Sequence, residues 1–69
     1  MNNMVKRWHG DAKYHRPVKS STVYKECREA LGNDCDGVHI IAPEFSNCAI
    51  NAVDKALEKY GVTVILNID

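Results

Sequence analysis

The stretch VHIIAPEFSNCAINAVDKALEKYGVTVILNI, residues 38–68, determines the fold that the sequence predicts. It opens at residues 38–42 with a short β-branched run, which is typical of a strand. Residues 44–60 then place apolar side chains at helical spacing, and residues 62–68 have the alternation of a second strand. A strand, a helix and a strand joined this compactly predict two neighbouring parallel strands with a right-handed crossover.

Residues at both ends support the helix predicted over 44–60. Pro43 suits the first turn of a helix, where its missing N–H is not needed, and Gly61 suits the C-terminal stop. The apolar positions of this helix are Phe45, Ala49, Ile50, Val53, Ala56, Leu57 and Tyr60. The last strand is expected to place one set of side chains on one face, Val62, Val64, Leu66 and Ile68, and another on the opposite face, Thr63, Ile65 and Asn67.

A second helix is predicted over residues 20–32. Ser20 or Ser21 is a suitable N-cap, and Gly32-Asn33 offers a left-handed stop. Apolar side chains recur along this segment with helical period, so one stripe is expected to face the core. The stripe consists of Val23, Cys27, Ala30 and Leu31.

The first segment of the chain, residues 4–17, is a candidate β-hairpin. Gly10-Asp11 can form a two-residue turn of the type that matches the twist of the flanking strands. Alternation of apolar residues is weak on both sides of this turn, so a single strand with an irregular arm remains an open alternative.

Together these elements predict one small α/β domain over residues 1–69, with residues 1–18 as a basic strand or hairpin arm and residues 19–69 as an αβαβ core. We expect a two-layer sandwich in β(β)αβαβ order, with a small mixed sheet and two helices on one face. A chain of 69 residues buries only about 60% of its unfolded surface, so a homodimer is expected to bury more.

Composition also limits where the protein is expected to act. No apolar run approaches the ~20 residues of a membrane span, and the N-terminus lacks an apolar signal core. Three cysteines, an odd number, fit reduced thiols. The sequence therefore predicts a cytoplasmic protein without a membrane partner.

A net charge of zero conceals an uneven distribution of charge along the chain. Residues 1–30 carry seven basic and three acidic side chains, whereas residues 31–69 carry two basic and six acidic ones. Charge divided in this way indicates an anionic partner for the basic half. The alternative is that the two halves neutralise each other, or that the basic side chains are merely solvated.

The basic arm interleaves cations with aromatic rings, in Lys6-Arg7-Trp8-His9 and again in residues 13–16. Phosphates attract cations, and flat rings stack on unpaired bases without demanding sequence. Packing of Trp8 and Tyr14 onto the first helix is the alternative. The predicted nucleic-acid-binding residues are Lys6, Arg7, Trp8, Lys13, Tyr14, Arg16 and Lys19.

Enzyme chemistry finds little support in the sequence. The four glycines are scattered as turn and cap residues rather than gathered in a phosphate-binding loop, and no order of Ser, His and Asp indicates a nucleophile. The pair Asp34/Asp36 is explained by its turn-rich surroundings. The sequence therefore predicts a protein that is not an enzyme, with no catalytic residue, no cofactor and no resident metal.

The cysteines are expected to be small buried thiols, because none of them forms a C-x-x-C pair. An alternative is a four-ligand zinc site made of His39 with Cys27, Cys35 and Cys48. That alternative belongs to a third functional class, a thiol or metal carrier.

Three short runs resemble the Alba superfamily of small nucleic-acid-binding proteins: residues 16–18 (Arg-Pro-Val), 37–42 (Gly-Val-His-Ile-Ile-Ala) and 49–54 (Ala-Ile-Asn-Ala-Val-Asp). The resemblance covers about residues 15–68, and Ser20-Ser21 matches a comparable pair in an Alba-like sporulation protein. It implies non-enzymatic binding of RNA or DNA, with Arg16 at an Alba basic position. The alternative class is a protein-interaction module, a small regulator or inhibitor that docks on an acidic protein.

Overall fold

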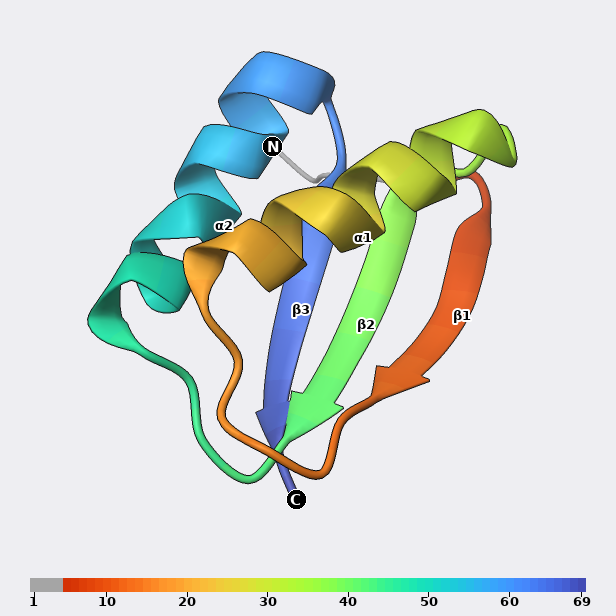
Figure 1. The fold of residues 1–69 in the computed structure, drawn as a ribbon. Coiled ribbons are helices and arrows are strands. Elements are labelled where there is room, and N and C mark those ends of the chain that lie inside the picture. The colour runs from red at the N-terminus through yellow and green to blue at the C-terminus, as the bar shows by residue number, and fades with distance from the viewer. Residues whose placement is uncertain (1–4) are drawn as a thin grey trace.

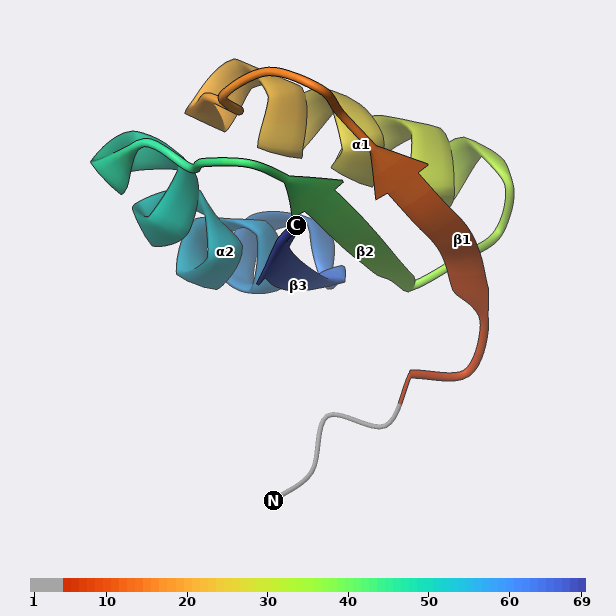
Figure 2. The same cartoon turned by 90° about the horizontal axis from the view of Figure 1, so that it is seen from below.

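A computed structural model describes residues 5–69 of the chain. The elements follow the order β-α-β-α-β and form one three-stranded sheet in which β2 lies between β1 and β3. Both helices lie on the same side of the sheet (Figures 1 and 2). In this part of the chain, neither helix has the length and apolar character needed to cross a membrane. The elements are β1 (Trp8–Lys13), α1 (Ser20–Gly32), β2 (Gly37–Ala42), α2 (Asn47–Tyr60) and β3 (Thr63–Ile68).

All strands of the sheet are parallel, so the expected mixed sheet is wrong. The candidate hairpin is also wrong over its described part, residues 5–17; its first residue, 4, lies outside the described residues. Gly10 and Asp11 lie within β1 instead of turning the chain back. The parallel pairing of β2 with β3 is confirmed, because a helix connects the carboxyl end of each strand to the amino end of the next.

The core lies between the sheet and the two helices. Val38, Ile40 and Ala42 of β2 are fully buried, and Ile40 is the largest fully buried side chain. From the helices, small residues close the other side of the core, which lets the backbones approach. These residues are Val23 and Cys27 of α1 and Ala49, Ala52 and Ala56 of α2.

Helix α1 has the predicted bounds, but both of its ends are capped differently from the prediction. Lys19 is the N-cap and makes no side-chain capping bond, so the predicted capping by Ser20 or Ser21 is wrong. The left-handed residue that follows the helix is Asp34, with φ 58°, rather than Gly32 or Asn33. Of the predicted apolar stripe only Leu31 is exposed, at 42%, whereas the adjacent Ala30 is fully buried.

Helix α2 begins three residues later than predicted. The Ser46 hydroxyl accepts a hydrogen bond from the Ala49 N–H at 3.1 Å, which is an N-cap, so Pro43 lies in the connection and not in the first turn. Phe45 in that connection pairs with Val18 in an isolated bridge. Gly61 ends the helix in the left-handed region with φ 69°, as predicted.

Strand β3 confirms the predicted alternation near its start. Val62, in the connection, and Val64 are buried, while Ile65 on the opposite face is 46% exposed. Further along, Ile68 is 69% exposed although it belongs to the buried series. The helices therefore cover the start of β3 more completely than its end.

Candidate functional site

Strand β1 and the segments at its two ends carry the predicted binding residues, and the strand presents different side chains to the two faces of the sheet. Trp8 pairs with Gly37 and Asp11 pairs with His39, so three steps along β1 span the same length as two steps along β2. This register shift contains Gly10, whose φ is 113°. A bulge of this kind changes which face each later side chain occupies.

Trp8 lies on the open face of the sheet, the face without helices, and its side chain is 46% exposed. Its ring rests over Gly37, because a Cβ atom at that glycine would lie 2.9 Å from Trp8 Cε3 and 2.5 Å from Val5 Cγ1. Only glycine leaves room for both side chains at this position. The ring is therefore supported on one side and accessible on the other.

Lys6 and Arg7 lie at the amino end of β1, and their backbone is held by Asp36. The carboxylate of Asp36 accepts the N–H of Arg7 at 2.9 Å and the N–H of Lys6 at 3.0 and 3.1 Å. These donors, with Arg7 contributing most, hold the pKa of Asp36 below its ordinary value. The prediction that Asp36 serves a turn therefore missed its long-range contact with the arm.

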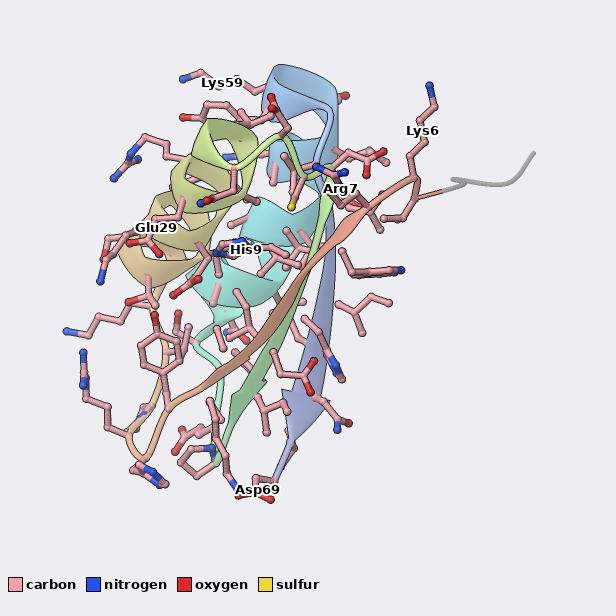
Figure 3. The ribbon with its side chains drawn as sticks, turned by 90° about the vertical axis from the view of Figure 1, so that its right-hand side faces the viewer. Lys6, Arg7, His9, Glu29, Lys59 and Asp69 are labelled. Carbon is pink, nitrogen blue, oxygen red and sulfur yellow. The ribbon has the colours of Figure 1, made fainter. Side chains whose placement is uncertain are left out.

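The other cations occupy the opposite end of β1 and the connection to α1. Figure 3 shows Lys6 and Arg7 at one end of the molecule and Asp69 at the other. The Lys13 ammonium lies 3.3 Å from the Asp69 carboxylate, an exposed ion pair. Arg16 and Lys19 are exposed beyond it. Because β1 has six residues, about 20 Å separates the two groups of cations.

Tyr14 is in a different environment from Trp8. Its hydroxyl donates a hydrogen bond to the buried Glu26 carboxylate of α1, and the Arg16 guanidinium lies 5.6 Å from its ring centroid. Burial, together with the bond to Glu26, raises the pKa of Tyr14 to about 12. Tyr14 thus packs toward α1, the alternative considered for it, whereas Trp8 faces the other side of the sheet.

Few of the charges neutralise one another within residues 5–69. The ion pairs in this range are Lys13 with Asp69 and, when the ring is protonated, His39 with Asp11 at 3.2 Å. No acidic oxygen of the described residues lies within 4.0 Å of the charged nitrogens of the remaining predicted cations. Those cations are Lys6, Arg7, Arg16 and Lys19.

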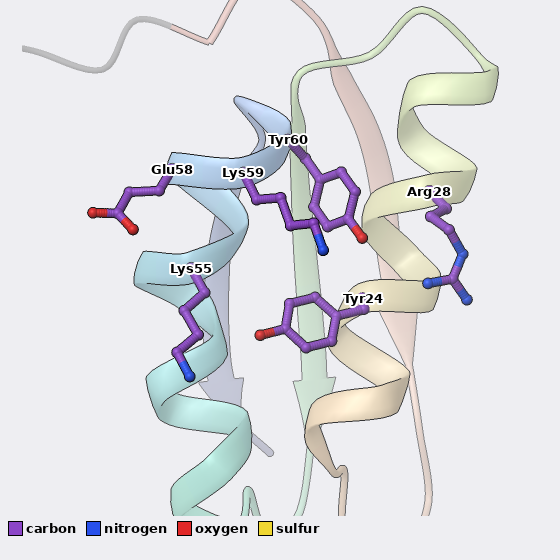
Figure 4. Close-up of a pocket in the computed structure, with 6 residues that line it drawn as sticks. All are labelled: Tyr24, Arg28, Lys55, Glu58, Lys59 and Tyr60. Atoms are coloured by element: carbon purple, nitrogen blue, oxygen red, sulfur yellow. The ribbon is translucent and has the colours of Figure 1, made fainter.

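A second cationic surface, which the sequence did not predict, lies between the two helices. A hollow of about 450 Å³ opens there, and its two tyrosine rings, Tyr24 and Tyr60, are tilted by 59° with centroids 6.2 Å apart (Figure 4). On each helix two lining residues are four positions apart, and this helical spacing is the signal that could have revealed the surface. The pairs are Tyr24 with Arg28 and Lys55 with Lys59. Its charged lining residues are Arg28, Lys55, Glu58 and Lys59.

The cysteines do not gather with His39. Cys27 and Cys35 are buried, as predicted, but Cys48 is exposed, so the prediction of a buried thiol is wrong there. Burial, with a smaller contribution from Glu26, raises the pKa of Cys27 to about 11 and keeps it a thiol at neutral pH. Within the described residues, the one group of three or more potential metal ligands contains no cysteine.

That group joins β1 to α1. It consists of His9, Glu26 and Glu29, whose ligand atoms all lie within 4.8 Å of one another. In the sequence, His9 belongs to the basic arm, and nothing there connects it with the helix. A contact between residues so distant in the chain has no local sequence signal.

Comparison with known protein families, with curated proteins and with solved structures finds no match for this chain. The resemblance to the Alba superfamily therefore stays a prediction that rests on the runs quoted above.

Proposed function

We propose that this protein is a small non-enzymatic domain that binds RNA or DNA by contacting phosphates through its basic N-terminal half. The observation that carries the proposal is that four of the five predicted cations have no acidic partner within residues 5–69. A cation without a partner remains available to a phosphate, and it releases counterions when it binds one. The proposal includes a cytoplasmic homodimer, as predicted from the sequence.

The placement of the cations suggests how a strand of nucleic acid would lie. Lys6 and Arg7 at one end and Lys13, Arg16 and Lys19 at the other would contact the backbone along the exposed edge of β1. The distance of about 20 Å between these groups matches several nucleotides of extended single strand, within the range that compact modules bind.

Trp8 is the stacking residue best supported by the geometry. Its ring is accessible and rigidly supported by Gly37, so a base can stack on it at little entropic cost. Stacking on Tyr14 remains part of the prediction, but it would require a base to displace Arg16 from the ring. We therefore expect Trp8 to contribute more binding free energy than Tyr14.

Fluorescence anisotropy with labelled single- and double-stranded oligonucleotides tests the proposal. If the five cations contact phosphates, the logarithm of the binding constant should fall with the logarithm of salt concentration at a slope of about −4. Replacing Lys6 and Arg7 by Gln should make this slope shallower by about 1.5 to 2. Undetectable binding at low salt would end the proposal.

The matched control is the double variant Lys55→Gln/Lys59→Gln, which removes the same charge from the hollow between the helices. We expect this control to change the slope little. If it weakened binding while the Lys6/Arg7 variant did not, the interface would lie on the helices and the proposed N-terminal site would be wrong. The control thus separates a local contact from the effect of total charge.

A protein-interaction module is the second candidate function. Exposed apolar side chains on β1 and β3, namely Trp8, Ile65 and Ile68, favour it, because such side chains gain free energy when a partner covers them. The variant Trp8→Ala discriminates the two candidates. The interaction module is supported if the unmodified protein gives no oligonucleotide signal and Trp8→Ala loses binding to a protein partner.

A further inference from the structure

We infer that His9, Glu26 and Glu29 form a binding site for a first-row divalent transition-metal ion such as Zn²⁺. The imidazole nitrogen comes from β1 and the two carboxylates come from α1, with all ligand atoms within 4.8 Å of one another. Figure 3 shows His9 and Glu29 on these two neighbouring elements. The inference goes beyond nucleic-acid binding and does not depend on it.

Glu26 is the buried ligand of this group, and no cation of the described residues pairs with it. Its side chain lies in α1 with only 6% exposed, yet the Tyr14 hydroxyl is its one side-chain hydrogen-bond donor within residues 5–69. No Lys, Arg or His nitrogen in this range lies within 4.0 Å of its carboxylate. A buried carboxylate without a counter-charge is costly, and a bound divalent ion would provide that charge.

Two local features bring the ligands together. Glu26 and Glu29 are three residues apart in a helix, so both project from the same side of α1. On β1, His9 directly follows Trp8, so the alternation of side chains directs His9 toward α1 while Trp8 stays on the open face. The extra residue that follows His9 then brings Tyr14 to the same side as His9, where it reaches Glu26. Bulges that redirect one side chain are common beside functional sites.

The ligand types and their spacing suit a transition metal. Imidazole nitrogen together with carboxylate oxygen favours Zn²⁺ and its neighbours over Mg²⁺, which prefers oxygen ligands alone. Metal–ligand bonds of about 2.1 Å would place tetrahedral ligand atoms about 3.4 Å apart, so the group must contract by about 1 Å. Glu29 is exposed and can make this movement. Three protein ligands leave a position for water.

Tyr14 would orient the site from outside. Its hydroxyl donates to one oxygen of Glu26 and leaves the other oxygen for the ion. Hydrogen bonds of this kind fix a ligating carboxylate, and their loss commonly weakens metal binding by about 10-fold to 100-fold. This gives a partly buried tyrosine of the basic arm a role that is separate from base stacking.

Calorimetric titration of the metal-free full chain with Zn²⁺, and absorption spectroscopy with Co²⁺, test the inference. The experiment uses a Cys48→Ser background, because the exposed Cys48 thiol would bind both ions by itself. We expect one equivalent of metal to bind and to raise the thermal midpoint of unfolding. His9→Gln and Glu29→Gln should each weaken binding at least 10-fold, and Tyr14→Phe should weaken it by a similar factor.

The matched controls are His15→Gln and Glu44→Gln, which remove the same groups from exposed positions outside the cluster. They should bind metal as the background protein does. No binding in the background protein, or binding that His9→Gln and Glu29→Gln leave unchanged, would overturn the inference. If Glu26→Gln fails to fold, these two variants of less buried residues still decide the question. Oligonucleotides are absent throughout, so the result is independent of the nucleic-acid proposal.

Discussion

The two faces of the sheet differ although the same strands form them. On β2, Val38, Ile40 and Ala42 are fully buried beneath the helices, whereas His39 and Ile41 between them are partly exposed. Residue type does not explain this difference, because Ile40 and Ile41 are identical side chains. Both right-handed crossovers proceed in the same direction along the sheet, so both helices lie on one side and leave the other open (Figure 2).

The largest expected effect compares these neighbouring isoleucines. Ile40→Ala should lower the free energy of unfolding by about 2–5 kcal/mol, because it leaves a cavity under both helices. Ile41→Ala on the open face should cost about 1 kcal/mol or less. Thermal unfolding followed by circular dichroism measures both, with about 4–8 °C expected per kcal/mol. Equal losses would contradict the assignment of the two faces.

A glycine substitution tests how the open face holds Trp8. In Gly37→Ala the new Cβ would meet Val5 and Trp8 side-chain atoms at 2.5 and 2.9 Å, so both side chains must shift. We expect a loss of about 1–3 kcal/mol and a red shift of tryptophan fluorescence, because the ring becomes more hydrated. Gly32→Ala is the matched control, since nothing lies within 4 Å of its added Cβ. An unchanged emission spectrum in Gly37→Ala would show that the ring does not rest on Gly37.

Acid should release Lys6 and Arg7, the residues before Trp8, from the Asp36 carboxylate. The lowered pKa of Asp36 means that its contribution to stability is present above the ordinary Asp pKa of about 3.9 and is lost as pH falls through the lower folded value. Amide NMR signals of Lys6 and Arg7 should therefore move together below about pH 4. Asp36→Asn should shift those signals at neutral pH, whereas Asp34→Asn should not. If the Lys6 and Arg7 amide signals did not change with pH, the proposed contact of these amides with the Asp36 carboxylate would be contradicted.

The smallest expected effect is at Ile65 on the open face. Ile65→Thr should change the unfolding free energy by about 0.5 kcal/mol or less, because its side chain is 46% exposed and stays β-branched. Sedimentation of the same variant measures whether the open face takes part in dimerisation. If the predicted homodimer uses the open face, the substitution should weaken dimerisation even though the monomer keeps its stability. A large loss of monomer stability would mean that this face is covered within the chain.

Much of the fold was predictable from the sequence because the signals were local. Helical periodicity from Phe45 to Tyr60, the stop at Gly61 and the alternation after it appear within a few residues of one another. The start of α2 was misplaced because Pro43 suits a first turn, whereas the Ser46 hydroxyl bonded to the Ala49 N–H fixes the actual start. Propensity could not choose between these two signals.

The candidate site was less predictable. The sequence identified the cations and rings of residues 6–19, but it did not show that Trp8 and Tyr14 would face opposite sides of the sheet. One extra residue in the register of β1 makes that difference, and only pairing with β2 reveals it. The hollow between the helices was missed for a related reason, since its lining residues come from two elements.

Local patterns in the sequence were enough to predict both helices, the last two strands and their parallel pairing, because periodicity and helix stops act over short distances along the chain. The direction of β1, the open face of the sheet and the meeting of His9 with Glu26 and Glu29 became visible only in the folded chain. Those features depend on which distant segments bury one another. The free energy of that burial belongs to the folded arrangement as a whole and leaves no local pattern in the sequence.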